Sequence, residues 1–194
     1  MNSQITKNNN VLELGKTYRL AGYDWTACEL INNGKTLVIQ SHGVTSGAWP
    51  GYVMPQFGNG NFYAADIDGE DISAYDDKMQ TLYDAIKDAE DSSASYGKGL
   101  FLISKEKAGF TEWREPGSGN YWQALKEASM NYQSFGAADG NASLGTVYVY
   151  HNAWYVYSDG YVYTDGNQDY DFVVPPAFNL DLSKIEIVGD EIII

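Results

Sequence analysis

The spacing of apolar and polar positions changes several times along the chain, and each spacing predicts a different element. The first ten residues are largely polar and without period, which predicts a flexible lead-in at 1–10 and an ordered domain from Val11. Residues 17–30 and 35–40 carry strand-like patterns on either side of Asn32, Asn33 and Gly34. Because these are turn residues between two apolar runs, a β-hairpin is expected.

Apolar residues three and four positions apart predict two amphipathic helices. The first carries Ile72, Tyr75, Met79, Leu82, Ile86 and Ala89, with Asp71 or Ser73 as its N-cap. The second extends from Tyr121 to about Tyr132, with Trp122, Leu125, Ala128 and Tyr132 on one side and Ser118 or Asn120 as its cap.

Other short runs predict strands. The apolar residues 99–104 suit a buried strand, and 146–150, 153–157, 161–163 and 171–174 suit a C-terminal antiparallel meander. Residues 42–62 are rich in Gly and Pro and predict a long irregular loop. The expected fold class is therefore α+β, with antiparallel strands, two helices and long irregular loops in a single domain at 11–194.

Tyrosines are concentrated near the C-terminus, where seven of the 16 fall within residues 148–170. They alternate with Val147, Val149, Trp154, Val156 and Val162, and this period of two predicts tyrosines on one face and a core on the other. Six outward tyrosines could present on the order of 1,000 Å², more than a monomer normally leaves exposed. Ser, Gly, Asn and Asp lie between them, as in an antibody paratope. An ordinary sheet that uses Tyr for its strand propensity is the alternative.

The composition excludes several classes of function. A net charge of −14, from 26 acidic and 12 basic residues, disfavours nucleic acid and anionic membranes as partners. No apolar run is long enough to predict a transmembrane helix, so the chain as given is expected to be soluble, with its location open. The single cysteine, Cys28, cannot form an internal disulfide and is expected to be a small buried residue.

The candidate catalytic and metal-binding groups are sparse. His42 and His151 lack the spacing of a metal site, and the chain contains no nucleophile elbow, P-loop or dinucleotide fingerprint. Four clustered carboxylates precede the first helix: Asp66, Asp68, Glu70 and Asp71. Helix capping is the favoured interpretation of this cluster, and a calcium site is the alternative. We therefore expect neither an enzyme nor a cofactor.

Asparagine codons offer one explanation of the tyrosine-rich segment. Tyr, His, Asp and Ser codons each differ from AAT or AAC by one change at an adenine, and these residue types with Asn fill most outward and turn positions of 148–170. The intervening Val and Trp residues do not follow this pattern. The segment is therefore consistent with an Asn-rich template in which adenines were randomised.

Several motifs carry a family resemblance: Leu144-Gly-Thr, Asn152-Ala-Trp, Ser158-Asp-Gly and the closing Asp171-Phe-Val-Val-Pro-Pro-Ala-Phe-Asn-Leu-Asp-Leu. With these motifs the chain resembles the variable proteins of diversity-generating retroelements that have a C-type lectin fold, particularly those of gut bacteria and their phages. The resemblance covers residues 11–182, and its specific part is the last 40 residues. The paired cysteines of formylglycine-generating enzymes and the Trp-Asn-Asp and Glu-Pro-Asn motifs of calcium-dependent lectins are missing from the sequence.

The resemblance implies that an adenine-mutagenic reverse transcriptase rewrites a C-terminal stretch, so that a constant scaffold displays changing residues. The implied variable, ligand-binding positions are Tyr148, Tyr150, His151, Tyr155, Tyr157, Tyr161, Tyr163, Asp165, Asp169 and Tyr170. The implied scaffold positions are Leu144, Gly145, Trp154, Phe172, Pro176, Phe178 and Leu180.

The expected function is ligand binding, or receptor recognition, through this hypervariable surface. The expected partner is a variable macromolecule, either a protein or a host-cell surface molecule, and the oligomeric state is open. The alternative is a phage virion or surface decoration protein that uses the tyrosine-rich face for subunit assembly.

Overall fold

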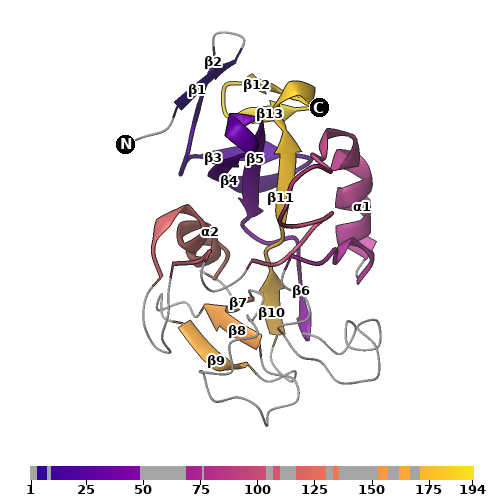
Figure 1. Cartoon of the computed structure of the whole chain (residues 1–194). Helices are drawn as coiled ribbons and strands as arrows, with labels where there is room; N and C mark the ends of the chain where they lie inside the picture. The colour runs from indigo at the N-terminus through magenta and orange to yellow at the C-terminus, as the bar shows by residue number, and fades with distance from the viewer. Residues whose placement is uncertain are drawn as a thin grey trace.

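The computed structural model describes residues 4–7, 10–48, 69–75, 77–103, 107–109, 117–129, 133–135, 153–156, 162–166 and 171–194. These residues form three β-sheets, two α-helices and several short 3-10 turns (Figure 1). The expected α+β class is confirmed. Among the described residues, no helix is both long and apolar enough to cross a membrane.

A six-stranded sheet forms the centre of the fold. Its strand order is β11-β5-β4-β3-β13-β12, and the strands are β3 (Thr17–Leu20), β4 (Tyr23–Ile31), β5 (Thr36–Ser41), β11 (Ala177–Asp181), β12 (Glu186–Val188) and β13 (Glu191–Ile193). Neighbouring strands are antiparallel except β13 and β3, which are parallel. The predicted hairpin is confirmed, since β4 and β5 are joined by η1 (Asn32–Gly34), where Asn33 and Gly34 adopt positive φ.

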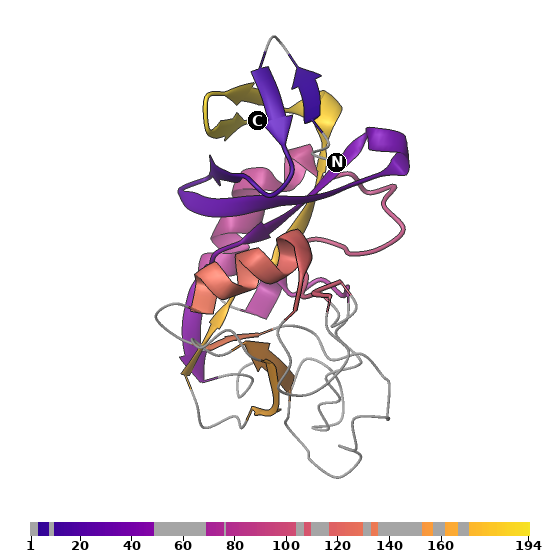
Figure 2. The same ribbon diagram turned by 90° about the vertical axis from the view of Figure 1, so that its left-hand side faces the viewer.

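Strands β5 and β11 of the central sheet are buried on both faces. Leu37, Ile39 and Phe178 share one hydrophobic cluster with Met79 and Leu82 of α1 (Asp77–Ile86). On the opposite face, Cys28, Val38 and Ala177 share a second cluster with Tyr121, Trp122 and Leu125 of helix α2 (Gly119–Ser129). The sheet therefore lies between the two helices (Figures 1 and 2).

Both predicted helices form, with ends that differ from the prediction. The first is divided into η4 (Ser73–Tyr75), α1 and η5 (Lys87–Ala89), and the backbone N–H of Ser73 donates to Asp71 Oδ1 at 2.8 Å. The second ends at Ser129, three residues before the expected Tyr132. Ser118 precedes α2, but its hydroxyl donates to the carbonyl of Gly109.

The predicted strand at 99–104 is wrong, although its described apolar residues, 100–103, are all buried. Phe101 makes one isolated bridge to Ala177 of β11. Leu100 makes its hydrogen bonds to the irregular segment that includes Ile72 and Ser73. Its carbonyl accepts from Ile72 N–H, and its own N–H donates to Ser73 Oγ. An apolar run predicts burial, but a strand also needs a regular partner.

The N-terminal segment begins to pair earlier than expected. Strand β1 (Gln4–Lys7) is antiparallel to β2 (Asn10–Glu13), so regular pairing begins at Gln4 rather than near Val11. The register places Ile5 opposite Leu12, whose side chain is buried in the main core. This buried leucine anchors the hairpin on the fold.

A second sheet lies beyond the central one, in the order β6-β10-β7-β8-β9. Its strands are β6 (Thr45–Ala48), β7 (Gln133–Phe135), β8 (Ala153–Val156), β9 (Val162–Gly166) and β10 (Asp171–Val174). The expected antiparallel meander is therefore wrong beyond β8 and β9, since β10 pairs with β7 in parallel and with β6. Strand β6 falls inside the expected loop at 42–62, and 49–62 and 146–150 lie outside the described residues.

Candidate binding surface

Three of the predicted binding positions lie on two paired strands. Tyr155 is in β8, and Tyr163 and Asp165 are in β9. The register places Tyr155 opposite Tyr163 and Val156 opposite Val162. Directly paired positions lie on one face of a sheet, and successive positions alternate between its faces. The tyrosine positions therefore share one face of this hairpin and the valine positions share the other.

The other seven predicted binding residues lie outside the described residues: Tyr148, Tyr150, His151, Tyr157, Tyr161, Asp169 and Tyr170. In sequence, Tyr157 and Tyr161 follow β8 and precede β9 directly. The structure thus brings together the positions of Tyr155 and Tyr163, with Asp165 further along the same strand.

Phe135 extends the tyrosine positions onto a third strand. The register pairs Phe135 of β7 with Tyr155 of β8, which is itself paired with Tyr163 of β9. Three aromatic positions therefore form a row across β7, β8 and β9. Sequence reasoning did not assign Phe135 to the surface, because a three-residue strand shows no alternation and its pairing partner lies 20 positions away.

Helix α2 connects this sheet to the central one, because it contacts β4 and β5 as well as β7 and β8. Asn120 Nδ2 donates to the carbonyl of Cys28 at 2.9 Å, and the Tyr121 hydroxyl donates to Glu29 Oε2 at 3.0 Å. Lys107 Nζ lies 2.7 Å from the same Glu29 oxygen and over the Tyr121 ring. Burial, together with the nearby Cys28 and Glu29, raises the pKa of Tyr121 far above its ordinary value, so its hydroxyl remains a donor.

Four of the expected scaffold residues lie in β10, in β11 or between them: Phe172, Pro176, Phe178 and Leu180. Phe178 and Leu180 are fully buried in the main core, and Pro176 is also buried. The Gln40 side-chain amide donates to the carbonyl of Pro175, and Ser41 N–H donates to that of Pro176 at 2.9 Å. Trp154 and Phe172 fall in β8 and β10, and Leu144 and Gly145 lie outside the described residues.

Cys28 and His42 do not form a nucleophilic pair. The Cys28 thiol is buried and donates to the Thr26 carbonyl at 3.3 Å, which confirms the prediction of a small buried residue. Burial raises the pKa of this thiol well above its ordinary value, so the reactive thiolate is disfavoured. His42 is half-buried with Nε2 2.7 Å from Thr26 Oγ1, and burial lowers its pKa, which favours the neutral imidazole at pH 7.

The carboxylates near the first helix support capping. Asp71 Oδ1 accepts from both the backbone N–H and the hydroxyl of Ser73, the first residue of η4, whereas α1 itself begins at Asp77. Glu70 is exposed, and Asp66 and Asp68 lie outside the described residues. Within the described ranges, no three His, Cys, Asp or Glu side chains are grouped so that they could hold a metal ion.

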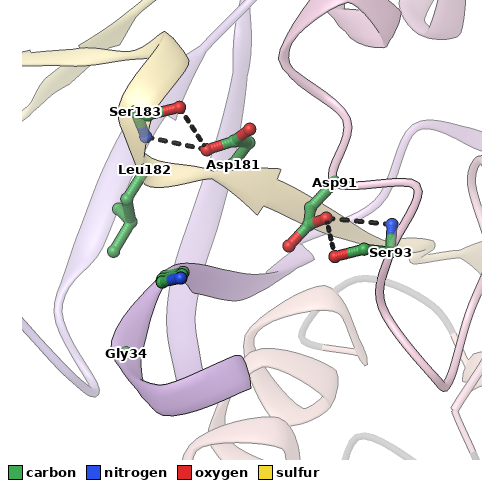
Figure 3. A pocket seen from close by; sticks show the side chains of 7 residues that line it. Gly34, Asp91, Ser93, Asp181, Leu182 and Ser183 are labelled. Carbon is green, nitrogen blue, oxygen red and sulfur yellow. Dashed lines mark hydrogen bonds between the residues drawn. The ribbon is translucent and has the colours of Figure 1, made fainter.

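A surface cavity of about 510 Å³ is lined by two further carboxylates, Asp91 and Asp181 (Figure 3). Each accepts from the backbone N–H of the serine two residues later, Ser93 or Ser183, at 2.9 Å and from its hydroxyl at 2.6 Å. Hydrogen bonds from Ser93 and Thr36 lower the pKa of Asp91 to about 2. Because bonds within the fold already occupy these oxygens, the cavity is a structural feature rather than a candidate catalytic site.

The described residues thus offer a row of aromatic positions on β7, β8 and β9 and no grouping that could hold a metal ion. No protein-family model, curated protein or solved structure matches the chain. The functional inference accordingly depends on the sequence pattern and on the strand register.

Proposed function

We propose that this chain is a ligand-binding protein with a C-type lectin-like fold, whose tyrosine-rich surface is diversified by adenine-specific retroelement mutagenesis. The observation that carries the proposal is the β8–β9 register, which pairs Tyr155 with Tyr163 and, at the next position, Val156 with Val162. The alternation read along the sequence is thereby matched across the strands. The ligand is a variable macromolecule, either a protein or another molecule of a host-cell surface.

The chemistry of tyrosine supports this proposal. An aromatic side chain offers roughly 150–250 Å² of contact area with only two side-chain torsions to order, so tyrosine contributes affinity at a low entropic cost. The row from Phe135 to Tyr163 spans three strands, which is the geometry of an extended contact area rather than of a deep pocket. A net charge of −14 favours ligands that are neutral or basic at the contact.

The position of the strands supports a surface that can change. Strand β9 is the last strand of its sheet and pairs only with β8 among the described strands. Strand β11, which carries the proposed scaffold residues Phe178 and Leu180, is instead in the central sheet, where both residues are buried. Substitutions at the tyrosine positions of β9 therefore disturb few pairings. The α+β architecture, with two helices and a largely antiparallel central sheet, is compatible with the proposed fold.

A double substitution tests the proposed face. We expect Tyr155→Ala with Tyr163→Ala to abolish binding to a ligand selected against the wild-type chain from a displayed library of cell-surface proteins, with Tm changed by less than about 2 °C. The matched control, Val156→Ala with Val162→Ala, is at the next paired positions and should lower Tm by roughly 6–10 °C, because valines of a core face leave cavities.

Calorimetry and binding of both variants decide between the two faces. A large loss of Tm in the tyrosine variant would place those side chains in the core and overturn the proposal. Static light scattering adds a second criterion. A stable oligomer of the wild-type chain that dissociates in the tyrosine variant would instead assign this face to subunit assembly.

The neighbouring DNA tests diversification separately. We expect a near-copy of the codons for 148–170 close to a reverse-transcriptase gene, with differences from the copy confined to its adenines. Sequencing of the locus in several isolates should then show variation at positions such as Tyr155 and Tyr163 and constancy at Phe178 and Leu180. Variation spread evenly over both sets would contradict retroelement mutagenesis.

A further inference from the structure

An exposed apolar surface lies at the end of the molecule opposite β8 and β9. Val188 of β12 is 54% exposed, Ile193 of β13 is 44% exposed, and Val11 of β2 is 40% exposed. Strand β12 pairs with β13 and contacts β2, so the three residues come from neighbouring strands. In both views these strands occupy one end of the fold, whereas β8 and β9 occupy the other (Figures 1 and 2).

The β12–β13 hairpin divides its residues sharply between two faces. Ile187 and Ile192 are buried in the main core, whereas their neighbours Glu186, Val188, Glu191 and Ile193 are exposed. The register pairs Glu186 with Ile193 and Val188 with Glu191. On the outer face each apolar side chain therefore lies opposite a carboxylate, and Val188 and Ile193 are diagonal neighbours.

Glu186 and Glu191 are the two carboxylates of this outer face. No ion pair found among the described residues includes Glu186 or Glu191. Asp190 in the intervening turn is paired with Lys16 at 2.6 Å. Arg19 is opposite Glu191 in the β3–β13 register, but its guanidinium is 3.2 Å from Asp24. A partner that covers Val188 and Ile193 therefore also covers two carboxylates, which is costly unless it supplies cations.

We propose that the outer face of the β12–β13 hairpin is a docking surface for a partner protein segment in which apolar side chains alternate with Lys or Arg. A second copy of this chain is disfavoured, because a two-fold contact would bring Glu186 and Glu191 against the same residues. An anionic lipid surface is disfavoured by the same carboxylates. A partner held here leaves β8 and β9 free, so this end of the fold is suited to attachment to a carrier.

Binding of two designed peptides tests the proposal. The probes are a peptide that alternates Lys with Val and a matched peptide that alternates Glu with Val, each titrated into the ¹⁵N-labelled full chain. We expect the basic peptide to shift the amide signals of Val188, Glu191 and Ile193, with an affinity that falls as salt rises, and the acidic peptide to leave them unchanged. No shift with the basic peptide, or equal shifts with both, would overturn the proposal.

Substitutions identify the groups responsible. Val188→Ser with Ile193→Ser should lower the affinity for the basic peptide roughly tenfold. Glu186→Gln with Glu191→Gln should weaken it about threefold and remove most of its salt dependence. The control Glu127→Gln, an exposed glutamate of α2, should change neither property. Unchanged binding in the first two variants would contradict docking at this face.

Two further measurements test the other occupants. If sedimentation shows that the wild-type chain forms a dimer and that the serine variant does not, the occupant of this face is a second copy. If the wild-type chain floats with phosphatidylglycerol vesicles, the occupant is a membrane. The tyrosine variant, Tyr155→Ala with Tyr163→Ala, should bind the basic peptide with wild-type affinity. Its result separates a failure of this proposal from a failure of the proposed ligand-binding face.

Discussion

Gly97 is held in one conformation by contacts from three parts of the chain. Its φ of +83° lies in the left-handed region, and an added Cβ would lie 2.3 Å from the Phe101 ring. That ring packs edge-on against Tyr96 with centroids 5.5 Å apart. The side-chain amide of Asn179, from β11, donates to the carbonyls of Tyr96 and Gly97 at 2.7 and 3.1 Å. Backbone conformation and packing therefore both require glycine here.

A pair of glycine variants separates these two requirements. Gly97→Ala is expected to lower the free energy of unfolding by about 3 kcal/mol, because backbone strain adds to a clash with Phe101. The control is Gly22→Ala, which has a φ of +86° but no atom within 4 Å of the added Cβ. It should cost about 1 kcal/mol, for strain alone. Chemical denaturation of both variants measures the difference, and equal losses would show that the Phe101 contact contributes nothing.

Helix α1 shows how an element combines a local pattern with a tertiary partner. Its apolar residues Met79, Leu82 and Ile86 are buried against the central sheet, and its other residues are mostly exposed. The three-and-four spacing that predicted this helix is the spacing of the buried residues. The 3-10 turns on either side were not predicted, because a 3-10 turn and an α-helical turn share the same short-range apolar spacing.

Neighbouring positions on α1 give a matched test of this packing. Leu82→Ala should lower the free energy of unfolding by about 3 kcal/mol, since Leu82 is only 2% exposed and its loss leaves a cavity. Thr81→Ala, one position earlier and exposed, should be neutral or slightly stabilising because alanine has the higher helix propensity. Thermal and denaturant unfolding of the two variants provide the comparison. Similar losses at both positions would contradict the assigned helix face.

Across the whole molecule, segments far apart in sequence are joined by a few polar groups. Asp91 follows η5 and accepts hydrogen bonds from Asn32 and Thr36, at the turn between β4 and β5, while its backbone N–H donates to Asn179 of β11 at 2.9 Å. Thr36 is fully buried, and its hydroxyl accepts from Asn32 Nδ2 at 2.9 Å and donates to this carboxylate. Asp91 therefore connects the α1 side of the fold to the turn η1, to strand β5 and to strand β11.

The pH dependence of stability tests this connection. The pKa of Asp91 is lowered from 3.8 to about 2, so the ionised group stabilises the fold above about pH 4, and that contribution is lost as the pH falls toward 2. Asp91→Asn should therefore be about 1 kcal/mol less stable than wild type at pH 7, with the difference shrinking between pH 4 and pH 2. The control Asp88→Asn removes a nearby exposed charge and should keep the wild-type profile. A constant difference at all pH values would contradict the role of the ionised carboxylate.

The sequence by itself determined the local features of this protein. The β4–β5 hairpin, the helix with Leu82 and Ile86 on its buried face, and the burial of Cys28 all follow from turn residues, apolar spacing and composition, which act within a few residues. The alternation of Tyr with Val at 155–156 and 162–163 was also visible in the sequence.

Only the tertiary structure decided which segments meet. It placed Phe135 opposite Tyr155, paired β10 in parallel with β7, and gave residues 100–103 an irregular partner instead of a strand. It also left Val188 and Ile193 exposed, whereas the preceding residues Ile187 and Ile192 are buried. These outcomes depend on strand register and on contacts between distant segments, and a local pattern carries no information about the partner that a residue meets after folding.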